Sequence, residues 1–307
     1  MEIFWILLAK LVPLYLMIGL GYIASRFLAA QKETVGRILI YIITPAVVFY
    51  GTATANLDAG NLLLPLVFFA VACANCLLFF GIGKRAFNGR PEKNILAFAA
   101  GSANVGYFGL PVALALFDSQ IFAMAVLSVM GLILYENTVG FFVVANGSYG
   151  SRASFAKLVR LPAIYAFAAG VLFNAAGFNL GGLAASTLDY FKAAYTLLGM
   201  MLIGMGMVVV DFKKIDFKFV TLAFLAKFII WPAAIAAIIL CDANFSHIFS
   251  AGAYKVMVLM AVVPLAANTV AYATEFKTCC DKAALAVLLS TLFALLYVPL
   301  AARLFLG

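Results

Sequence analysis

Two stretches interrupt long apolar segments of this chain: GSANVGYFGLP at residues 101–111 and VVPLAANTVAY at residues 262–272. Each places Gly, Pro or Asn where a membrane-spanning helix would otherwise continue. In hydrocarbon, an unwound backbone leaves amide and carbonyl groups unsatisfied, and each such group is costly. Unwound backbone at that depth therefore survives only where it lines a cavity inside the protein, so the two stretches predict a buried binding site.

The composition indicates an integral membrane protein. Of the 307 residues, 66% are hydrophobic and 10% are charged. Apolar stretches of about 20 residues recur, which is the length needed to cross a hydrocarbon core of about 30 Å. We predict an all-α membrane protein with ten transmembrane helices, at roughly 3–28, 35–55, 62–83, 94–117, 121–145, 160–178, 193–210, 219–240, 255–273 and 283–306.

The basic residues predict the orientation. Of the 20 Lys and Arg residues, 15 lie in alternate loops between the predicted spans. These loops face the cytosol by the positive-inside rule, and an even number of spans then places both termini outside. We expect a multi-pass protein of the plasma membrane, which in bacteria is the inner membrane. The formal net charge of +8 belongs to these loops and predicts contact with the lipid bilayer, with no nucleic acid as partner.

The chain shows signs of an internal repeat. AKLVPL at 9–14 opens the first predicted span and AKLVRL at 156–161 opens the sixth. The interrupted spans are the fourth and the ninth, each the fourth of five. Because five is odd, a second copy would cross the membrane upside down, so residues 1–150 and 151–307 are expected to form two inverted repeats with crossed broken helices, the architecture of secondary transporters.

The first break combines residues that suit an unwound segment. Gly106 and Gly109 permit backbone angles forbidden to other residues, and Pro111 suits the first turn of a new helix. Asn104 offers both a hydrogen-bond donor and an acceptor. We therefore expect two half-helices in the fourth span.

The second break supplies Pro264, Asn268 and Thr269. Two antiparallel broken helices that cross at the middle of the membrane point the N-termini of their half-helices at one place. Each N-terminus carries about half a positive charge, so that place favours an anion. Asn104 and Asn268 would orient the anion there by hydrogen bonds, without the cost of burying a charge.

Two charged residues lie deep in the predicted spans. Glu136 and Lys227 are about eight or nine residues from the inner ends of the fifth and eighth spans, which places them about 12 to 13 Å deep. A charge at that depth is expensive, so we expect both to face the interior and to form an ion pair, or else to couple transport to an ion. Oxygens of Ser102 and Thr269, with carbonyl groups of the breaks, are candidate ligands for sodium.

Catalysis is not expected. The sequence has one histidine, His247, and no nucleophile and base pair at a plausible place in the membrane. Its five cysteines match no zinc spacing. We predict no cofactor, with Na⁺ or H⁺ as the open choice of coupling ion.

The motifs resemble the auxin efflux carrier family, which includes bacterial malonate and malate permeases. The resemblance extends over nearly the whole chain. The fold family also resembles the sodium and bile-acid symporters. The family resemblance lies in N-x-G-x-x-G-x-P at 104–111, VVPLAANTVAYATEF at 262–276, LLSTLFALLYVPL at 288–300, YIITPAVVF at 41–49 and LPAIYAFAAGVLF at 161–173. One departure is AAYTLLGMM at 193–201, where related sequences often have a proline.

The resemblance implies ten helices in two inverted repeats of five, with helices one, two, six and seven as a scaffold. Members carry organic anions across the plasma membrane, many of them as dimers, so a homodimer is implied. The resulting candidate substrate-binding residues are Asn104, Gly106, Tyr107, Gly109, Pro111, Pro264, Asn268 and Thr269.

The leading hypothesis is a secondary active transporter that moves a small carboxylate, such as malonate or malate, by alternating access. An exporter of indole acids or amino acids and a sodium-coupled anion symporter remain alternatives. A membrane sensor that binds a ligand without transporting it is the alternative from another class. Cation exchange ranks lower, because Glu136 is the one acid clearly at depth.

Overall fold

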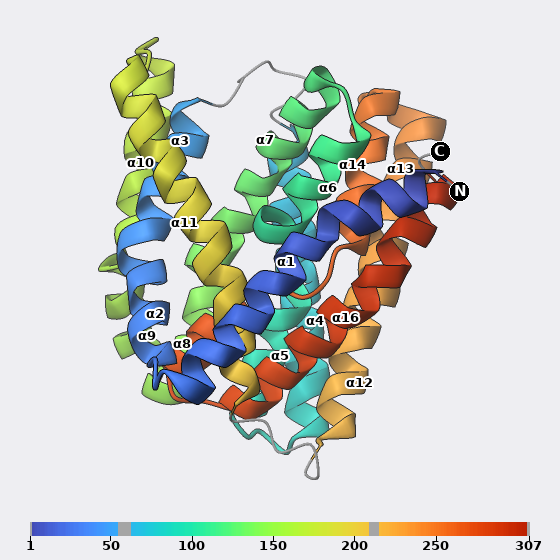
Figure 1. The fold of residues 1–307 in the computed structure, drawn as a ribbon. Helices are drawn as coiled ribbons and strands as arrows, with labels where there is room; N and C mark the ends of the chain where they lie inside the picture. The colour runs from blue at the N-terminus through green and yellow to red at the C-terminus, as the bar shows by residue number, and fades with distance from the viewer. Residues whose placement is uncertain (1, 55–62, 209–214, 306–307) are drawn as a thin grey trace.

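A computed structural model of the chain describes residues 2–54, 63–208 and 215–305, and its regular elements are all helices (Figure 1). Five of them, labelled η, are short π-helical turns. In chain order the elements are α1 (Glu2–Phe27), α2 (Lys32–Ile38), η1 (Leu39–Ile43), α3 (Thr44–Ala53), α4 (Leu63–Ala86), α5 (Glu92–Gly101), η2 (Val105–Gly109), α6 (Leu110–Leu116), α7 (Ser119–Tyr135), η3 (Glu136–Gly140), α8 (Phe141–Tyr149), α9 (Ser151–Val159), α10 (Pro162–Ala175), α11 (Gly182–Met207), α12 (Phe217–Leu225), η4 (Ala226–Ile230), α13 (Trp231–Cys241), η5 (Asp242–Ser246), α14 (Ala251–Val262), α15 (Asn268–Glu275) and α16 (Cys280–Phe305).

Across the described residues these elements follow the ten predicted spans in order, and the all-helical, multi-span fold class is confirmed. Five of the ten predicted spans are continuous helical segments that are long and apolar enough to cross a membrane. The bent pair α9 and α10, which turns by 45°, gives a sixth. The five continuous segments are Lys32–Ala53, Leu63–Ala86, Gln120–Tyr149, Phe217–Ser246 and Cys280–Ala302.

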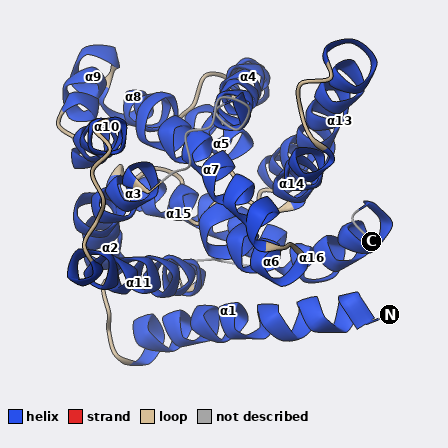
Figure 2. Ribbon diagram, turned by 90° about the horizontal axis from the view of Figure 1, so that it is seen from above, coloured by secondary structure: helices blue, strands red, loops and turns tan. Residues whose placement is uncertain are grey.

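The helices pack in two groups. In one group α1 lies against α11, and α3 lies against α10 and α11; Figure 2 shows α1 along one edge of the molecule beside α11. In the other, α4 packs on α5 and α7, and α16 packs on α12, α14 and α15 while also lying against α11 and α1 of the first group. Close approach of α1 and α11 depends on Gly21 and Gly204, where any side chain would collide with the backbone of the other helix.

Both predicted breaks are present, and they touch. The first half of the fourth span ends at Gly101 and the first half of the ninth ends at Val262. The backbone N–H of Asn104 donates to the carbonyl oxygen of Pro264 at 2.9 Å. The crossing of the two broken helices is thus a direct contact between their unwound backbones. The inverted-repeat relation between residues 1–150 and 151–307 stays a prediction.

One end of the molecule is held by charged contacts. We call it the basic side, where α2, α5, α12 and α16 begin, the lower end in Figure 1. The ammonium of Lys282 contacts Glu92 at 2.9 Å and Asp216 at 2.8 Å, which ties the starts of α5, α12 and α16 together. Burial raises the pKa of each carboxyl, but the hydrogen bond from Lys282 and further hydrogen bonds outweigh it and leave both pKa values lowered.

A second contact on the basic side joins α2, which continues through η1 into α3 of the first group, to α15 of the second group. Arg37 of α2 contacts Glu275, the last residue of α15, at 3.1 Å, and the hydroxyl of Tyr41 donates to the same carboxylate at 3.3 Å. The N-terminus of α1 and the C-terminus of α16 lie toward the opposite side (Figure 1). The placement of both termini on one side agrees with an even number of spans. Which side faces outward stays a prediction.

Candidate functional site

A small cavity lies where the two broken spans meet. It is formed by residues of both breaks together with α7, η3 and α11, including Asn104, Tyr107, Glu136, Tyr195 and Asn268. Its volume is about 20 Å³. A cavity of that size holds about one water molecule, so a substrate-sized guest requires the elements around it to move apart.

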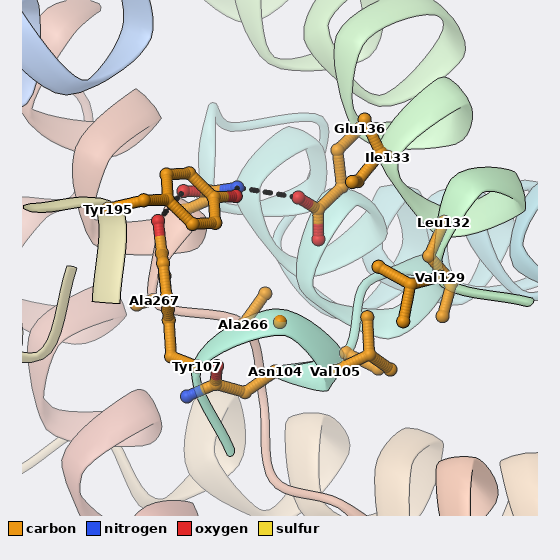
Figure 3. A pocket seen from close by; sticks show the side chains of 13 residues that line it. Asn104, Val105, Tyr107, Val129, Leu132, Ile133, Glu136, Tyr195, Ala266 and Ala267 are labelled. Atoms are coloured by element: carbon orange, nitrogen blue, oxygen red, sulfur yellow. Dashed lines mark hydrogen bonds between the residues drawn. The ribbon is translucent and has the colours of Figure 1, made fainter. Parts of the chain in front are cut away.

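Asn268 is the hydrogen-bonding centre of this cavity. It is the first residue of α15, and its side-chain amide donates to Oε2 of Glu136 at 2.6 Å and to the hydroxyl of Tyr195 at 3.5 Å. Its carbonyl oxygen accepts from the hydroxyl of Tyr107 at 3.4 Å. Figure 3 shows the side chains of Glu136, Tyr107 and Tyr195 close together at the cavity. The bond to Glu136 is the shortest of the three.

Glu136 is held by both broken spans. Its side chain is 4% exposed and stands at the start of the π-helical turn η3, which interrupts the fifth span. Besides Asn268 of the ninth span, the backbone N–H of Ala103 in the first break is a hydrogen-bond partner of the carboxylate. The acid that sequence reasoning placed at depth therefore lies in the crossover cavity itself. Single π-helical turns occur often at functional sites.

Asn104 lines the cavity without a full set of partners. Its side chain is 2% exposed, its Oδ1 has no hydrogen-bond partner, and its Nδ2 lies 4.0 Å from the sulfur of Met200. A buried polar atom without a partner is costly unless a ligand or a water satisfies it. The Oγ1 of Thr269, on the other broken span, is buried and unpartnered in the same way. Both asparagines expected at the site line one cavity, whereas Thr269 is not among the residues that line it.

The expected ion pair between Glu136 and Lys227 is wrong as a direct contact. Lys227 lies in η4 and is fully buried, as its depth predicts, but its Nζ has no hydrogen-bond partner. Instead the ammonium lies 4.6 Å from the ring centroid of Trp231, whose indole N–H donates to the carbonyl of Ala100 at 2.6 Å. Lys227 thus makes a cation–π contact with Trp231, and it attracts Glu136 without touching it.

The glycines of the first break act by close packing. We expected Gly106 and Gly109 to adopt unusual backbone angles, but neither is among the positive-φ glycines of the described residues. A Cβ on Gly109 would lie 3.0 Å from the sulfur of Met260, and one on Gly106 would lie 3.4 Å from the ring of Tyr195. The absence of side chains here lets the half-helix approach α14 and α11. The prediction that these glycines provide unusual backbone angles was therefore wrong, and close packing explains their presence instead.

Of the remaining predicted residues, some lie where they were expected and others do not. Pro264 contributes its carbonyl oxygen to the junction but does not line the cavity. Pro111 stands in the first turn of α6 as expected, and its side chain lies outside the described part of the chain. The second half-helix nevertheless starts earlier, in the π-helical turn that begins at Val105. The hydroxyl of Ser102 donates back to the carbonyl of Ala99 at 3.3 Å, a bond that turns it toward its own helix.

A much larger cavity adjoins the crossover. We call it the vestibule; its volume is about 510 Å³, and it lies between α3 and α11 on one side and α6 and α7 on the other. Its described lining is mainly apolar, and Lys192 is the one charged side chain in it. The ammonium of Lys192 lies 4.1 Å from the ring centroid of Tyr50 and contacts Asp189 at 2.6 Å. The residues that line both cavities are Gly106, Val129, Ile133 and Tyr195.

Sequence reasoning missed Tyr195. It is buried, packs its ring 4.3 Å from that of Tyr107, and lines both cavities. The signal was present in AAYTLLGMM at 193–201, the one stretch noted as a departure from related sequences. Gly199 of the same stretch faces the Tyr107 ring so closely that no Cβ would fit. The departure thus falls on residues that shape the site.

Comparison with known proteins identifies the family of the chain. Residues 6–302 match the model of a family described as membrane transport protein, which confirms the family resemblance seen in the motifs. An uncharacterized transporter of Methanothermobacter thermautotrophicus is 24% identical over 287 residues, 92% of each chain. An uncharacterized transporter of Methanocaldococcus jannaschii is 27% identical over 203 residues, 61% of this chain and 64% of the other.

Proposed function

Because the chain belongs to the membrane transport protein family, we propose that it is a secondary active transporter of small organic anions. Carboxylates such as malonate or malate are the leading substrate class. The protein works without a cofactor and without catalysis, in a plasma membrane with both termini outside, and a homodimer is its expected assembly. A transporter is the common statement of the family and of both relatives, and the substrate is our proposal.

The observation that carries the proposal is the junction of the two breaks. Unwound backbone from both spans meets at the bond from Asn104 to Pro264, and the cavity beside it contains two asparagine side chains. The N-terminal turns of η2 and α15 begin at this cavity, so the positive ends of two helix dipoles face it. Amide donors and helix N-termini together favour a carboxylate.

The two cavities support alternating access. The vestibule adjoins the crossover from the side opposite the basic side, since it is lined by Tyr50 and Thr54 at the far end of the second span. On the basic side the same two helix groups are joined by Arg37 and Glu275. A substrate would reach the crossover through the vestibule and leave after that contact opens, as the crossed helices move against α1, α3, α10 and α11.

A larger carboxylate is the second candidate. The vestibule offers a mainly apolar lining with a single ammonium, that of Lys192. This combination suits a molecule with one carboxylate and an apolar body, such as an indole acid, better than a molecule with two carboxylates. The same crossover would bind the carboxylate in either case.

Flux into proteoliposomes tests the proposal. We expect purified protein to carry labelled malonate, malate or indole-3-acetate, and Asn104→Ala to lower the rate at least tenfold. Asn244→Ala is the matched control, because Asn244 is exposed and bonds only to its own helix at Leu240 among the described residues. Binding of these acids without flux would instead identify a sensor. Equal flux in Asn104→Ala and Asn244→Ala would remove the crossover as the site.

A further inference from the structure

The carboxylate of Glu136 occupies the place that the crossover prepares for an anion. Its two hydrogen-bond partners are the side-chain amide of Asn268 and the backbone N–H of Ala103, one from each broken span. These are the donors on which a substrate carboxylate would also depend. The protein therefore holds a carboxyl group of its own at the proposed substrate site.

No cation contacts this carboxylate in the described part of the chain. The polar groups that face it from neighbouring elements are hydroxyls and amides, and the Lys227 ammonium attracts it without a hydrogen bond. The titratable groups around Glu136 are Tyr107 on η2, Tyr135 on α7, Tyr195 on α11, Tyr272 on α15 and Lys227 on η4.

Two ionised carboxylates cannot share this cavity. The hydrogen-bond donors that hold Glu136 are neutral groups, and Lys227, the described ammonium that attracts it, makes no hydrogen bond with it. Where two carboxylates share one site in proteins, one of them holds a proton. The substrate enters as an anion, because the two half-helix N-termini attract a negative charge. Glu136 is therefore the carboxylate that binds the proton.

We propose that Glu136 takes up one proton each time a substrate carboxylate binds at the crossover, so that anion transport is coupled to proton transport in the same direction. A proton from the vestibule solution converts the Glu136 carboxylate to the acid, and the substrate anion takes over the Asn268 donor. After the domains shift, the anion leaves to the other side, and the acid releases its proton there. The cycle moves one proton with each anion and is electroneutral for a monocarboxylate. This inference rests on the proposed transport function.

The wild-type protein provides the first test. Proteoliposomes with a pH-sensitive dye inside receive malonate, malate or indole-3-acetate, and labelled uptake is measured beside internal pH, against protein-free liposomes that correct for passive permeation of the acids. We expect internal acidification that follows uptake of the transported acid. For a monocarboxylate, each pH unit of inward gradient drives about tenfold accumulation. A protein that carries none of these acids refutes the proposed function, whereas one that carries an acid without protons refutes only the coupling.

The variant Glu136→Gln provides the second test. Its amide fills the same volume but cannot take up and release a proton, so we expect accumulation driven by the pH gradient to fall from about tenfold to about onefold. Exchange of labelled for unlabelled substrate across equal pH should persist, which shows that the variant is folded. Glu33→Gln, an exposed acid on α2, is the matched control and should accumulate like wild type. Gradient-driven accumulation in Glu136→Gln would overturn the proposal, and so would a loss of proton coupling in Glu33→Gln.

Discussion

Replacing Asn268 by Asp changes the crossover by one functional group. The two side chains have nearly the same shape, but the amide that donates to Glu136 at 2.6 Å becomes a carboxylate. An attractive contact is thereby converted into a repulsive one with no change in volume. We expect Asn268→Asp to destabilise the protein more than Asn268→Ala does.

The magnitudes follow from the geometry. Loss of a hydrogen bond to a charged group costs about 1.5 to 3 kcal/mol, and this is the expected effect of Asn268→Ala. Two unit charges about 4 Å apart repel by about 4 kcal/mol at an effective dielectric constant of about 20. Asn268→Asp suffers this repulsion in addition to the lost bond. The difference between the variants, about 4 kcal/mol, corresponds to roughly a thousandfold in the unfolding equilibrium.

Thermal unfolding of the purified variants in detergent at pH 8 measures the order of stability. We expect wild type to be the most stable, then Asn268→Ala, then Asn268→Asp. The penalty of Asn268→Asp should be smaller at pH 6, because one of the two carboxylates can then bind a proton. Asn244→Asp, an exposed site, should change the free energy of unfolding by no more than about 0.5 kcal/mol.

A double variant completes the test. In Glu136→Gln with Asn268→Asp the amide and the carboxylate exchange places, so the hydrogen bond can form with its direction reversed. We expect this pair to recover most of the stability that Asn268→Asp loses, which a double-mutant cycle reports as a coupling energy. The electrostatic reasoning would be refuted if Asn268→Asp were as stable as Asn268→Ala. It would also be refuted if the double variant were no more stable than Asn268→Asp alone.

Three further predictions concern other parts of the molecule. Lys192→Gln should raise the KM for an anionic substrate about two- to fivefold, because the vestibule loses its one described ammonium while exposure keeps the effect small; initial rates of uptake measure it, and an unchanged KM would exclude Lys192 from recruiting the anion. The lowered pKa values of Glu92 and Asp216 mean that the stabilisation they give is complete above about pH 5 and is lost as the pH falls below about 4. Acid unfolding followed by circular dichroism should show this loss in wild type and a smaller one in Lys282→Met. Gly131→Ala would drive its methyl carbon into a backbone oxygen of α4 and should lower the midpoint of thermal unfolding markedly, whereas Gly19→Ala, where the same carbon meets open space, should leave it nearly unchanged.

The sequence predicted the fold because its strongest signals are local. The length of the apolar stretches depends only on bilayer thickness, and Gly, Pro and Asn interrupt a helix wherever they cluster at depth. Both breaks are therefore found where GSANVGYFGLP and VVPLAANTVAY placed them. The start of the second half-helix at Val105, ahead of Pro111, was not predictable, since a π-helical turn leaves no pattern in the residues.

The site was predicted in part, for a related reason. Asn104, Asn268 and Glu136 stood out because polar groups at depth must find partners in the protein. Which partner each one finds depends on packing between distant segments. The amide of Asn268 hydrogen-bonds Glu136, and the ammonium of Lys227 lies over the ring of Trp231. Glu136 and Lys227 therefore do not make the direct contact that was expected. Tyr195 was missed because the tyrosine alone does not stand out in an apolar span, and the departure at AAYTLLGMM that contains it did not indicate which residue faces the cavity.

The contact between Arg37 and Glu275 has a consequence for conditions inside the cell. The side chain of Arg37 is 64% exposed, and attraction between solvent-exposed charges weakens as the concentration of salt rises. Under the proposed alternating access, a higher ionic strength on the basic side is therefore expected to weaken this contact and to ease opening of the transporter toward that side.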